Sequence, residues 1–286
     1  MLRAATRGSA LARWQTAHIA ELLGSAASVQ PILVTTAGDQ LADEPISAIG
    51  GKGVFVKEVQ AAVLDGRADI AVHSAKDLPA ATPDGLVIAA VPLRADPRDA
   101  LVGCRLADLP EGALVATGSA RRRVQLREIR PDLRFAELRG NIGTRLAKAA
   151  HYDAVVIAQA ALERLGEHPP VVDVLDCETM VPQVGQGALA VECREDDHKV
   201  RALLAAIEDS TTRRVVDAER AFLATLGGDC TLPAGAHAHI QGSTLAMRAV
   251  LADGPDGRCH TAVGEGEDGE ALGQRLARQL LDTVAW

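Results

Sequence analysis

Apolar positions follow two alternating patterns along most of the chain. Short unbroken apolar runs, such as Ile70 to Val72, are typical of strands buried in a parallel sheet. Between them, apolar residues recur at helical spacing. Strands are expected at 2–6, 31–36, 70–72, 86–91, 113–116, 133–138, 153–158 and 188–192. Helices are expected over 11–23, 54–64, 160–165, 212–226 and 270–284, and in the segments that carry Arg121 and Arg145. This order predicts an α/β protein with mostly parallel sheets.

The pattern is interrupted at places that indicate three domains. Residues 92–99 contain two prolines and several charges, which favours a crossing between two lobes. After residue 209 the pattern changes to one helix, short alternating strands at 237–240 and 245–251, and a closing helix. We therefore expect a discontinuous first domain (1–92 plus 188–208), a second domain (93–187) and a small third α/β domain (209–286).

Composition narrows the class of protein. Of the 286 residues, 48% are apolar and only 2% are aromatic, so Ala, Val and Leu must fill the core. No apolar run approaches the ~20 residues of a membrane span, and the N-terminus lacks a signal-peptide pattern, so we expect a cytoplasmic protein. A net charge of −8 disfavours nucleic acid or an acidic membrane as a partner. Five cysteines without a Cys-x-x-Cys pair argue against disulfides and a zinc site, and no metal is expected.

Four strand-to-helix junctions carry similar chemistry. Each combines small or hydroxyl residues, free backbone N–H groups and a cation, which are the parts of an anion site. They are Thr6-Arg7-Gly8-Ser9, His73-Ser74-Ala75-Lys76-Asp77, Thr117-Gly118-Ser119-Ala120-Arg121-Arg122, and Arg139-Gly140-Asn141 with Arg145. Any one of them alone is by default an ordinary helix cap with a solvated arginine. The repetition, with nine basic and three acidic residues from Arg121 to Lys148, predicts a cleft for a polyanion.

Asp77 is the acidic exception among these cations. A carboxylate there is placed to stabilise a cation or to move a proton, although it could simply orient Lys76. Two rival classes remain open. One is a non-catalytic anion receptor, because a two-lobed fold alone suits binding. The other is an enzyme with Ser74 as nucleophile and Lys76 as base, which we rank last because the two side chains are not expected to meet at a strand end.

Several motifs together resemble one family, the porphobilinogen deaminases, also called hydroxymethylbilane synthases. The match runs from Ala4 to about Pro233 and includes Gly50-Gly51-Lys52-Gly53-Val54-Phe55, the stretch Ala68 to Pro79, Asp96-Pro97-Arg98-Asp99-Ala100, Leu138 to Leu146, and Val184-Gly185-Gln186-Gly187. The resemblance implies two periplasmic-binding-protein-like lobes with a cleft between them. It also implies a third domain whose loop cysteine, here Cys230, carries a covalent dipyrromethane cofactor.

The resemblance further implies an activity and a set of site residues. Family enzymes act as monomers that add four porphobilinogen molecules, head to tail and with loss of ammonia, to the cofactor, and then release hydroxymethylbilane by hydrolysis. Asp77 matches the catalytic aspartate, which stabilises the azafulvene cation. Positions that match cofactor-binding residues are Lys76, Asp77, Ser119, Arg121 and Arg122. Positions that match substrate-binding residues are Arg7, Ser9, Gln15, Phe55, Arg139, Arg145, Arg164 and Gln186.

A few positions depart from the family pattern. Ala37 and Ala48 stand where many members have Arg and Lys, which removes two anion contacts, and Asp229 precedes the cysteine where Gly is usual. These changes bear on affinity and turnover more than on reaction type. Cys104, Cys177, Cys193 and Cys259 are expected to be inert small apolar residues.

Overall fold

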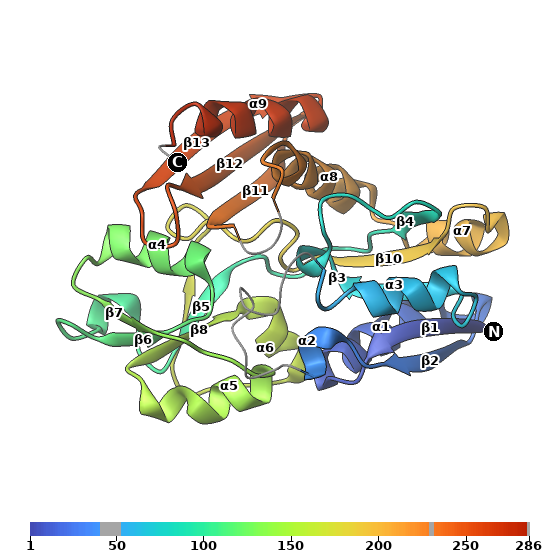
Figure 1. The fold of residues 1–286 in the computed structure, drawn as a ribbon, viewed down its shortest axis with the longest axis horizontal. Helices are drawn as coiled ribbons and strands as arrows, with labels where there is room; N and C mark the ends of the chain where they lie inside the picture. Colours follow the sequence, from blue (N-terminus) through green and yellow to red (C-terminus); the bar gives the residue numbers. More distant parts are fainter. Residues whose placement is uncertain (41–52, 229–231, 285–286) are drawn as a thin grey trace.

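The computed structural model describes residues 1–40, 53–228 and 232–284. Within these ranges the chain forms two five-stranded sheets and one three-stranded sheet. Figure 1 shows the two larger sheets side by side, each with its own helices, and the three-stranded sheet with its helices above them. We refer to these parts as the first lobe, the second lobe and the third domain.

The first lobe has the strand order β2-β1-β3-β10-β4. Its elements are β1 (Leu2–Arg7), α1 (Ala10–Leu23), β2 (Val29–Val34), α2 (Ala37–Gln40), α3 (Lys57–Leu64), β3 (Ile70–Ser74), β4 (Leu86–Ala90), β10 (Leu189–Arg194) and α7 (His198–Leu204). Strand β1 pairs in parallel with β2 and β3, whereas β10 runs antiparallel to β3 and β4. Four of the five strands therefore point the same way, and β10 is reversed.

The second lobe repeats this arrangement with the order β7-β6-β8-β5-β9. Its elements are β5 (Asp99–Val102), β6 (Leu114–Ala116), α4 (Ala120–Ile129), β7 (Arg134–Ala136), α5 (Ile142–Lys148), β8 (Ala154–Ala158), α6 (Gln159–Leu165) and β9 (Val172–Leu175). Here β5 is the reversed strand, antiparallel to β8 and β9. In each lobe the reversed strand follows directly on a segment that crosses from the other lobe.

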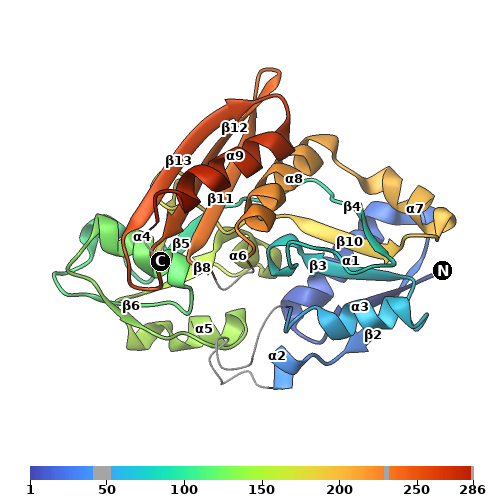
Figure 2. The same cartoon turned by 45° about the horizontal axis from the view of Figure 1, so that its top comes forward.

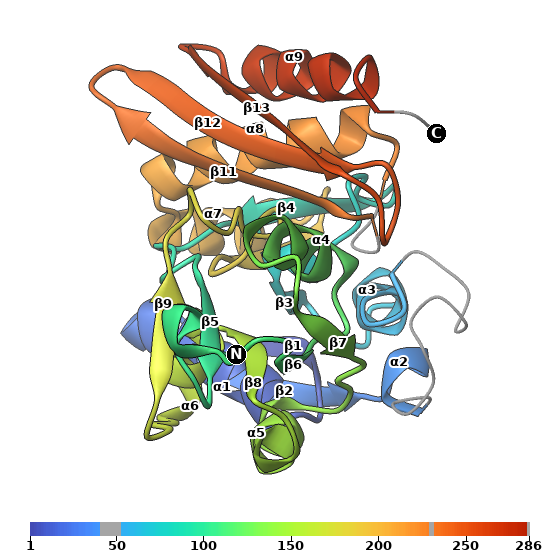
Figure 3. The ribbon, with the colours of Figure 1, turned by 90° about the vertical axis from the view of Figure 1, so that its left-hand side faces the viewer.

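The third domain is an antiparallel sheet covered by two helices. It contains α8 (Ser210–Thr225), β11 (Ala234–Gln241), β12 (Thr244–Ala252), β13 (Cys259–Gly266) and α9 (Gly269–Leu281). The helices pack side by side against the sheet, as Figures 2 and 3 show, around buried residues such as Phe222, Met247 and Leu276. At Gly273 of α9 a Cβ atom would come within 2.3 Å of the Ala218 carbonyl oxygen, so the close approach of the helices requires glycine.

The two crossing segments lie against each other and against the third domain. The Ala95 amide donates to the Gly187 carbonyl at 3.1 Å. Gly187 has a φ of +83°, and a Cβ there would lie 2.5 Å from the Ala95 oxygen. Glu219 of α8, which is fully buried, accepts hydrogen bonds from Arg94 Nη1 at 2.7 Å and from the Gly185 amide at 2.7 Å. One buried carboxylate thus ties the third domain to both crossings.

The predicted α/β architecture with two lobes and a third domain is confirmed. The helix expected from residue 54 begins at Lys57, and the strand expected at 31–36 lies at Val29–Val34. The reversed strand β5, its edge partner β9, and β13 were not predicted. None of the described helices is both long and apolar enough to cross a membrane.

Candidate active site

One cavity, called the first cavity below, lies at the carboxyl end of β1 and β3. It forms there because helices α1 and α3 begin on opposite faces of the sheet at this edge. Residues from these elements line it: Arg7, Ser9, Leu11, Ala12, Gln15, Phe55, Val56, Val59, Val72, His73, Ser74 and Asp77. Five residues predicted for the site from the sequence, Arg7, Ser9, Gln15, Phe55 and Asp77, therefore meet in one place.

Asp77 and Lys76 lie in one turn of 3₁₀ helix, Ala75–Asp77, that directly follows β3. Both side chains are partly buried. Asp77 lines the first cavity, whereas Lys76 lines the second. This turn is therefore where the two cavities approach each other.

Arg7 does not stand free in the first cavity. Its Nε donates to both carboxylate oxygens of Asp39, at 3.1 and 3.2 Å, and its guanidinium carbon lies 4.3 Å from the centroid of the Phe55 ring. Burial alone would raise the pKa of Asp39, but the hydrogen bonds from Arg7 and Thr36 outweigh burial and hold that pKa below its usual value. A substrate carboxylate at Arg7 would have to compete with Asp39.

Ser9 and Gln15 position α1 at the same cavity. The Ser9 hydroxyl accepts from the Ala12 amide at 3.3 Å and so caps the helix. Gln15, one and a half turns into the helix and buried, donates from Nε2 to Ser74 Oγ at 2.7 Å. This bond fixes the end of β3 against α1, immediately before the turn that carries Asp77.

The second cavity is built by all three parts of the molecule. Lys76 comes from the first lobe, Ser119 and Arg121 come from the second, and Leu223, Leu232 and Ala234 come from the third domain. Gln183 and Val184 of a crossing segment complete it. The Ser119 hydroxyl accepts from the Arg122 amide at 3.4 Å and so caps α4, which brings the first turn of this helix to the cavity.

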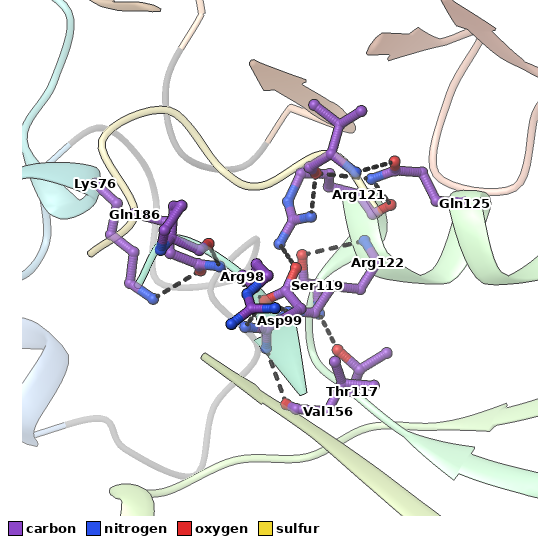
Figure 4. Close-up of polar contacts among 12 residues, drawn as sticks. Lys76, Arg98, Asp99, Thr117, Ser119, Arg121, Arg122, Gln125, Val156 and Gln186 are labelled. Atoms are coloured by element: carbon purple, nitrogen blue, oxygen red, sulfur yellow. Dashed lines mark hydrogen bonds and ion pairs between the residues drawn. The ribbon is translucent and has the colours of Figure 1, made fainter. Parts of the chain in front are cut away.

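Arg121 and Arg122 share a single buried carboxylate, Asp99, as Figure 4 shows. Arg121 Nη2 lies 2.8 Å from Asp99 Oδ2, and Arg122 Nη2 lies 2.7 Å from Asp99 Oδ1. Burial would raise the pKa of Asp99, but the two guanidinium groups outweigh it and hold the pKa far below its usual value. Burial also lowers the pKa of Arg121. With two cations on one anion, the cluster keeps a net positive charge beside the cavity.

Gln186 connects this cluster to Lys76. Its Nε2 donates to Asp99 Oδ1 at 2.9 Å, and its Oε1 accepts from Lys76 Nζ at 3.2 Å (Figure 4). Burial lowers the pKa of Lys76 to about 8, and the positive charge of Arg122 adds to this effect, whereas Asp77 and Asp99 oppose it. Lys76 is thus a desolvated cation held by a neutral amide.

Arg139 and Arg145 flank the start of α5. Asn141 caps this helix by accepting from the Thr144 amide at 3.0 Å, and Arg145 Nε donates to the Gly140 carbonyl at 2.8 Å. Arg139 lies 3.5 Å from Glu137. Burial lowers the pKa of Arg145 to about 10; Arg122 and Arg139 contribute to this shift and Asp77 opposes it. The opposing influence of Asp77 indicates that Arg145, a cation of the second lobe, lies within electrostatic reach of that carboxylate.

The last predicted cation, Arg164 of α6, lies against the first lobe. Its Nη2 donates to the Gly187 carbonyl at 2.7 Å, and burial lowers its pKa to about 10. Within the described ranges, Lys76, Arg145 and Arg164 have no carboxylate within ion-pair distance, unlike Arg7, Arg121 and Arg122. The three unpaired cations are therefore the ones most ready to receive an anion.

Some predicted residues lie outside the described ranges, namely Cys230, Ala48 and Asp229. Ala37 begins α2, and its amide donates to Glu58. The other four cysteines are free thiols, and burial raises the pKa of Cys177, Cys193 and Cys259 to about 11, which disfavours the reactive thiolate. No group of three or more His, Cys, Asp or Glu residues in the described part of the chain is arranged to hold a metal ion.

No functional role was predicted from the sequence for Asp39, Asp99 or Glu192. Asp99 directly precedes the apolar run Ala100–Val102, and an acid at the start of a buried strand is a signal that could have been used. Glu192 lies inside an apolar strand in the same way. It is fully buried, and its carboxylate accepts a hydrogen bond from Gln60 Nε2 at 2.9 Å. His73 Nε2 lies 3.0 Å from Glu192 Oε2.

The fold and these cavities define a class of protein, an α/β protein with two lobes and a third domain whose cavities are lined by cationic side chains. Among solved structures, an ancestral cationic amino acid solute binding protein aligns with a TM-score of 0.45 and 14% identity, covering 77% of this chain and 93% of that one. YhfZ from Shigella flexneri aligns with a TM-score of 0.38 and 18% identity, over 77% of this chain and 93% of that one.

Family models and relatives are more specific. Residues 2–202 match the model for the porphobilinogen deaminase dipyrromethane cofactor binding domain, and residues 214–282 match the porphobilinogen deaminase C-terminal domain. Porphobilinogen deaminase from Roseiflexus sp. (strain RS-1) is 47% identical over 97% of this chain and 94% of its own length. Porphobilinogen deaminase from Syntrophus aciditrophicus (strain SB) is 47% identical over 98% of this chain and 95% of its own length. The chain belongs to the porphobilinogen deaminase family.

Membership of the porphobilinogen deaminase family defines the reaction that the protein catalyses. The protein is a transferase of tetrapyrrole biosynthesis with a dipyrromethane cofactor. It condenses four porphobilinogen molecules head to tail, with release of ammonia, and hydrolysis then releases hydroxymethylbilane.

Proposed function

We propose that Asp77 is the catalytic carboxylate of this hydroxymethylbilane synthase reaction. It stabilises the azafulvene cation that forms on porphobilinogen when ammonia departs, because a fixed negative charge lowers the energy of a cation that develops next to it. The observation that carries the proposal is the position of Asp77. It lines one cavity and directly follows Lys76, which lines the other.

The remaining residues bind carboxylates and orient the substrate. Each porphobilinogen carries an acetate and a propionate group, and guanidinium groups bind such groups in a bidentate way. We assign the binding and orientation of the substrate to Arg7, Ser9, Gln15, Phe55, Arg139, Arg145, Arg164 and Gln186. The desolvated state of Arg145 and Arg164, whose pKa values are lowered to about 10, supports this role, since a bound carboxylate would relieve the cost of the buried charge.

We assign the dipyrromethane cofactor to the second cavity, which Lys76, Ser119 and Arg121 line. These three residues would hold it together with Asp77, which lines the first cavity, and Arg122, which pairs with Asp99; a thioether to Cys230 would attach it. Arg121 Nε is buried without a partner among the described residues, which leaves a donor for a carboxylate. Leu232, two positions after Cys230 in the sequence, lines this cavity together with Arg121. When bound, the cofactor supplies the pyrrole carbon to which the first porphobilinogen is joined.

The intact mass of the purified protein tests this proposal. It is expected to exceed the sequence mass by one dipyrromethane, and Cys230→Ser is expected to abolish the increment. Cys104→Ser is the control and should retain it. An unmodified mass in a protein that binds porphobilinogen without turnover would instead identify an anion receptor.

The proposal includes the organisation of the molecule. We take the domain boundaries as 1–92 plus 188–208, 93–187 and 209–286, which agrees with the membership of the three sheets. The working form is a cytoplasmic monomer whose partner is porphobilinogen and neither nucleic acid nor a membrane. Sedimentation of the purified protein tests the monomer.

A further inference from the structure

One aromatic side chain of the first lobe lies against a predicted substrate-binding cation of the second. Trp14 is in α1, and Arg164 is in α6, which packs against α1. The Arg164 guanidinium carbon lies 5.6 Å from the centroid of the Trp14 ring, within the range of a cation–π interaction. The contact therefore spans the two lobes.

Arg164 is otherwise weakly held. One hydrogen bond, from Nη2 to the Gly187 carbonyl at 2.7 Å, fixes one side of the guanidinium. Its Nε is buried and has no hydrogen-bond partner among the described residues. A buried guanidinium N–H without an acceptor lowers stability, so a hydrogen-bond acceptor at the Nε–H of Arg164 would be favourable. Among the described residues, the indole ring of Trp14 also restrains the orientation of the guanidinium.

Ordinary core packing does not account for Trp14. The ring is partly exposed and belongs to none of the apolar clusters formed by the described residues. Its other aromatic contact is with His18, one helical turn along, at 5.0 Å between ring centroids. An indole that is left out of the core but faces a cation across a lobe boundary is explained better by that cation.

We propose that Trp14 is a positioning residue that holds the Arg164 guanidinium so that its free Nε edge can bind a carboxylate of porphobilinogen. The inference rests on the proposed function, which assigns Arg164 to the substrate. Because the two residues come from different lobes, the contact also keeps Arg164 at a fixed place relative to the Asp77 cavity.

Fluorescence tests the contact without using activity. The chain has two tryptophans, so in a Trp286→Phe background the emission comes from Trp14. Arg164→Gln is expected to change the intensity or wavelength of this emission, because it removes a charge from the ring face. Arg134→Gln, at an exposed position elsewhere in the second lobe, is the control and should leave the emission of Trp14 unchanged. Unchanged emission in Arg164→Gln would overturn the contact.

A double-mutant cycle tests the positioning role. Trp14→Leu is expected to raise the KM for porphobilinogen about tenfold with kcat within about twofold, whereas Trp14→Phe, which keeps a ring face, should stay near wild type. Trp14→Leu combined with Arg164→Gln should be no worse than Arg164→Gln alone. Additive effects, or a wild-type KM in Trp14→Leu, would overturn the inference.

The same variants separate this inference from the proposed function. Both single mutants are expected to retain the dipyrromethane mass increment. If the increment is present but Arg164→Gln leaves KM unchanged, the role of Trp14 fails while the assignment of the cofactor stands. If the wild-type protein lacks the increment, the proposed function itself fails.

Discussion

Each lobe contains one fully buried carboxylate on its reversed strand, and the two carboxylates have different partners. Glu192 on β10 lies in the first lobe and is bound by the amide of Gln60, with His73 Nε2 3.0 Å from its carboxylate. Asp99 on β5 lies in the second lobe and is bound by two guanidinium groups and the amide of Gln186. The sheets have the same strand order, so the difference is local.

The position along the strand explains the difference. Asp99 is opposite Ala158, the last residue of β8, and so lies at the carboxyl edge where ligands bind. Glu192 is opposite Ala71, inside β3, away from that edge. At the edge, the carboxylate organises cations that face a cavity. In the interior, it joins a strand to a helix. The acid at the strand end therefore holds a cation that lines a cavity directly, whereas the acid inside the sheet reaches a cavity only through His73.

The largest expected effect is on stability. Asp99→Asn would leave two buried guanidinium groups without a carboxylate and is expected to lower the unfolding free energy by about 3–5 kcal/mol. Glu192→Gln keeps an oxygen for the Gln60 amide and should cost only about 1 kcal/mol. Urea unfolding of both variants measures the difference. Equal losses would show that strand position does not distinguish the two acids.

The next prediction concerns the two ends of β3. Asp77→Asn removes the negative charge at the carboxyl end and is expected to lower kcat by about a hundredfold or more while the dipyrromethane increment remains. Asp69→Asn is the matched control, because Asp69 lies just before the other end and pairs with Arg3 at 2.7 Å. Its kcat should stay within about twofold of wild type. Near-normal turnover in Asp77→Asn would remove Asp77 from the mechanism.

The smallest expected effect is a pH dependence. The folded protein holds the pKa of Lys76 at about 8, below the ordinary 10.5. Between these pH values the unfolded chain binds more protons, so this group makes the protein more stable as pH rises from 8 to 10.5. We expect a contribution of about 1 kcal/mol, because partial exposure screens the effect.

Unfolding of the Cys230→Ser protein across this pH range measures the contribution. Adding Lys76→Met should remove the rise relative to the parent protein, since the titrating group is gone. Lys199→Met, at an exposed position in α7, is the control and should leave the rise in place. If the unfolding free energies of the Lys76→Met variant and its parent depend on pH in the same way, the lowered pKa of Lys76 is contradicted.

The strand–helix junctions could be predicted well from the sequence, because the residues that form each junction are neighbours in the chain. Ser9, Ser119 and Asn141 cap the helices that follow them, and each cap could be read from neighbouring residues. The reversed direction of β5 could not be predicted in this way, because an apolar run has the same composition in either direction. The partners of Asp99 were missed for a related reason. They lie more than twenty positions away, and only the folded sheet brings them together.

The reversed strand β10 has a consequence for synthesis on the ribosome. It fills the gap between β3 and β4, yet the whole second lobe separates it from them in the chain. During translation the second lobe can complete its sheet while β3 and β4 still present unpaired edges, which invite incorrect association. The first lobe, with its catalytic turn, must therefore be the later of the two to mature.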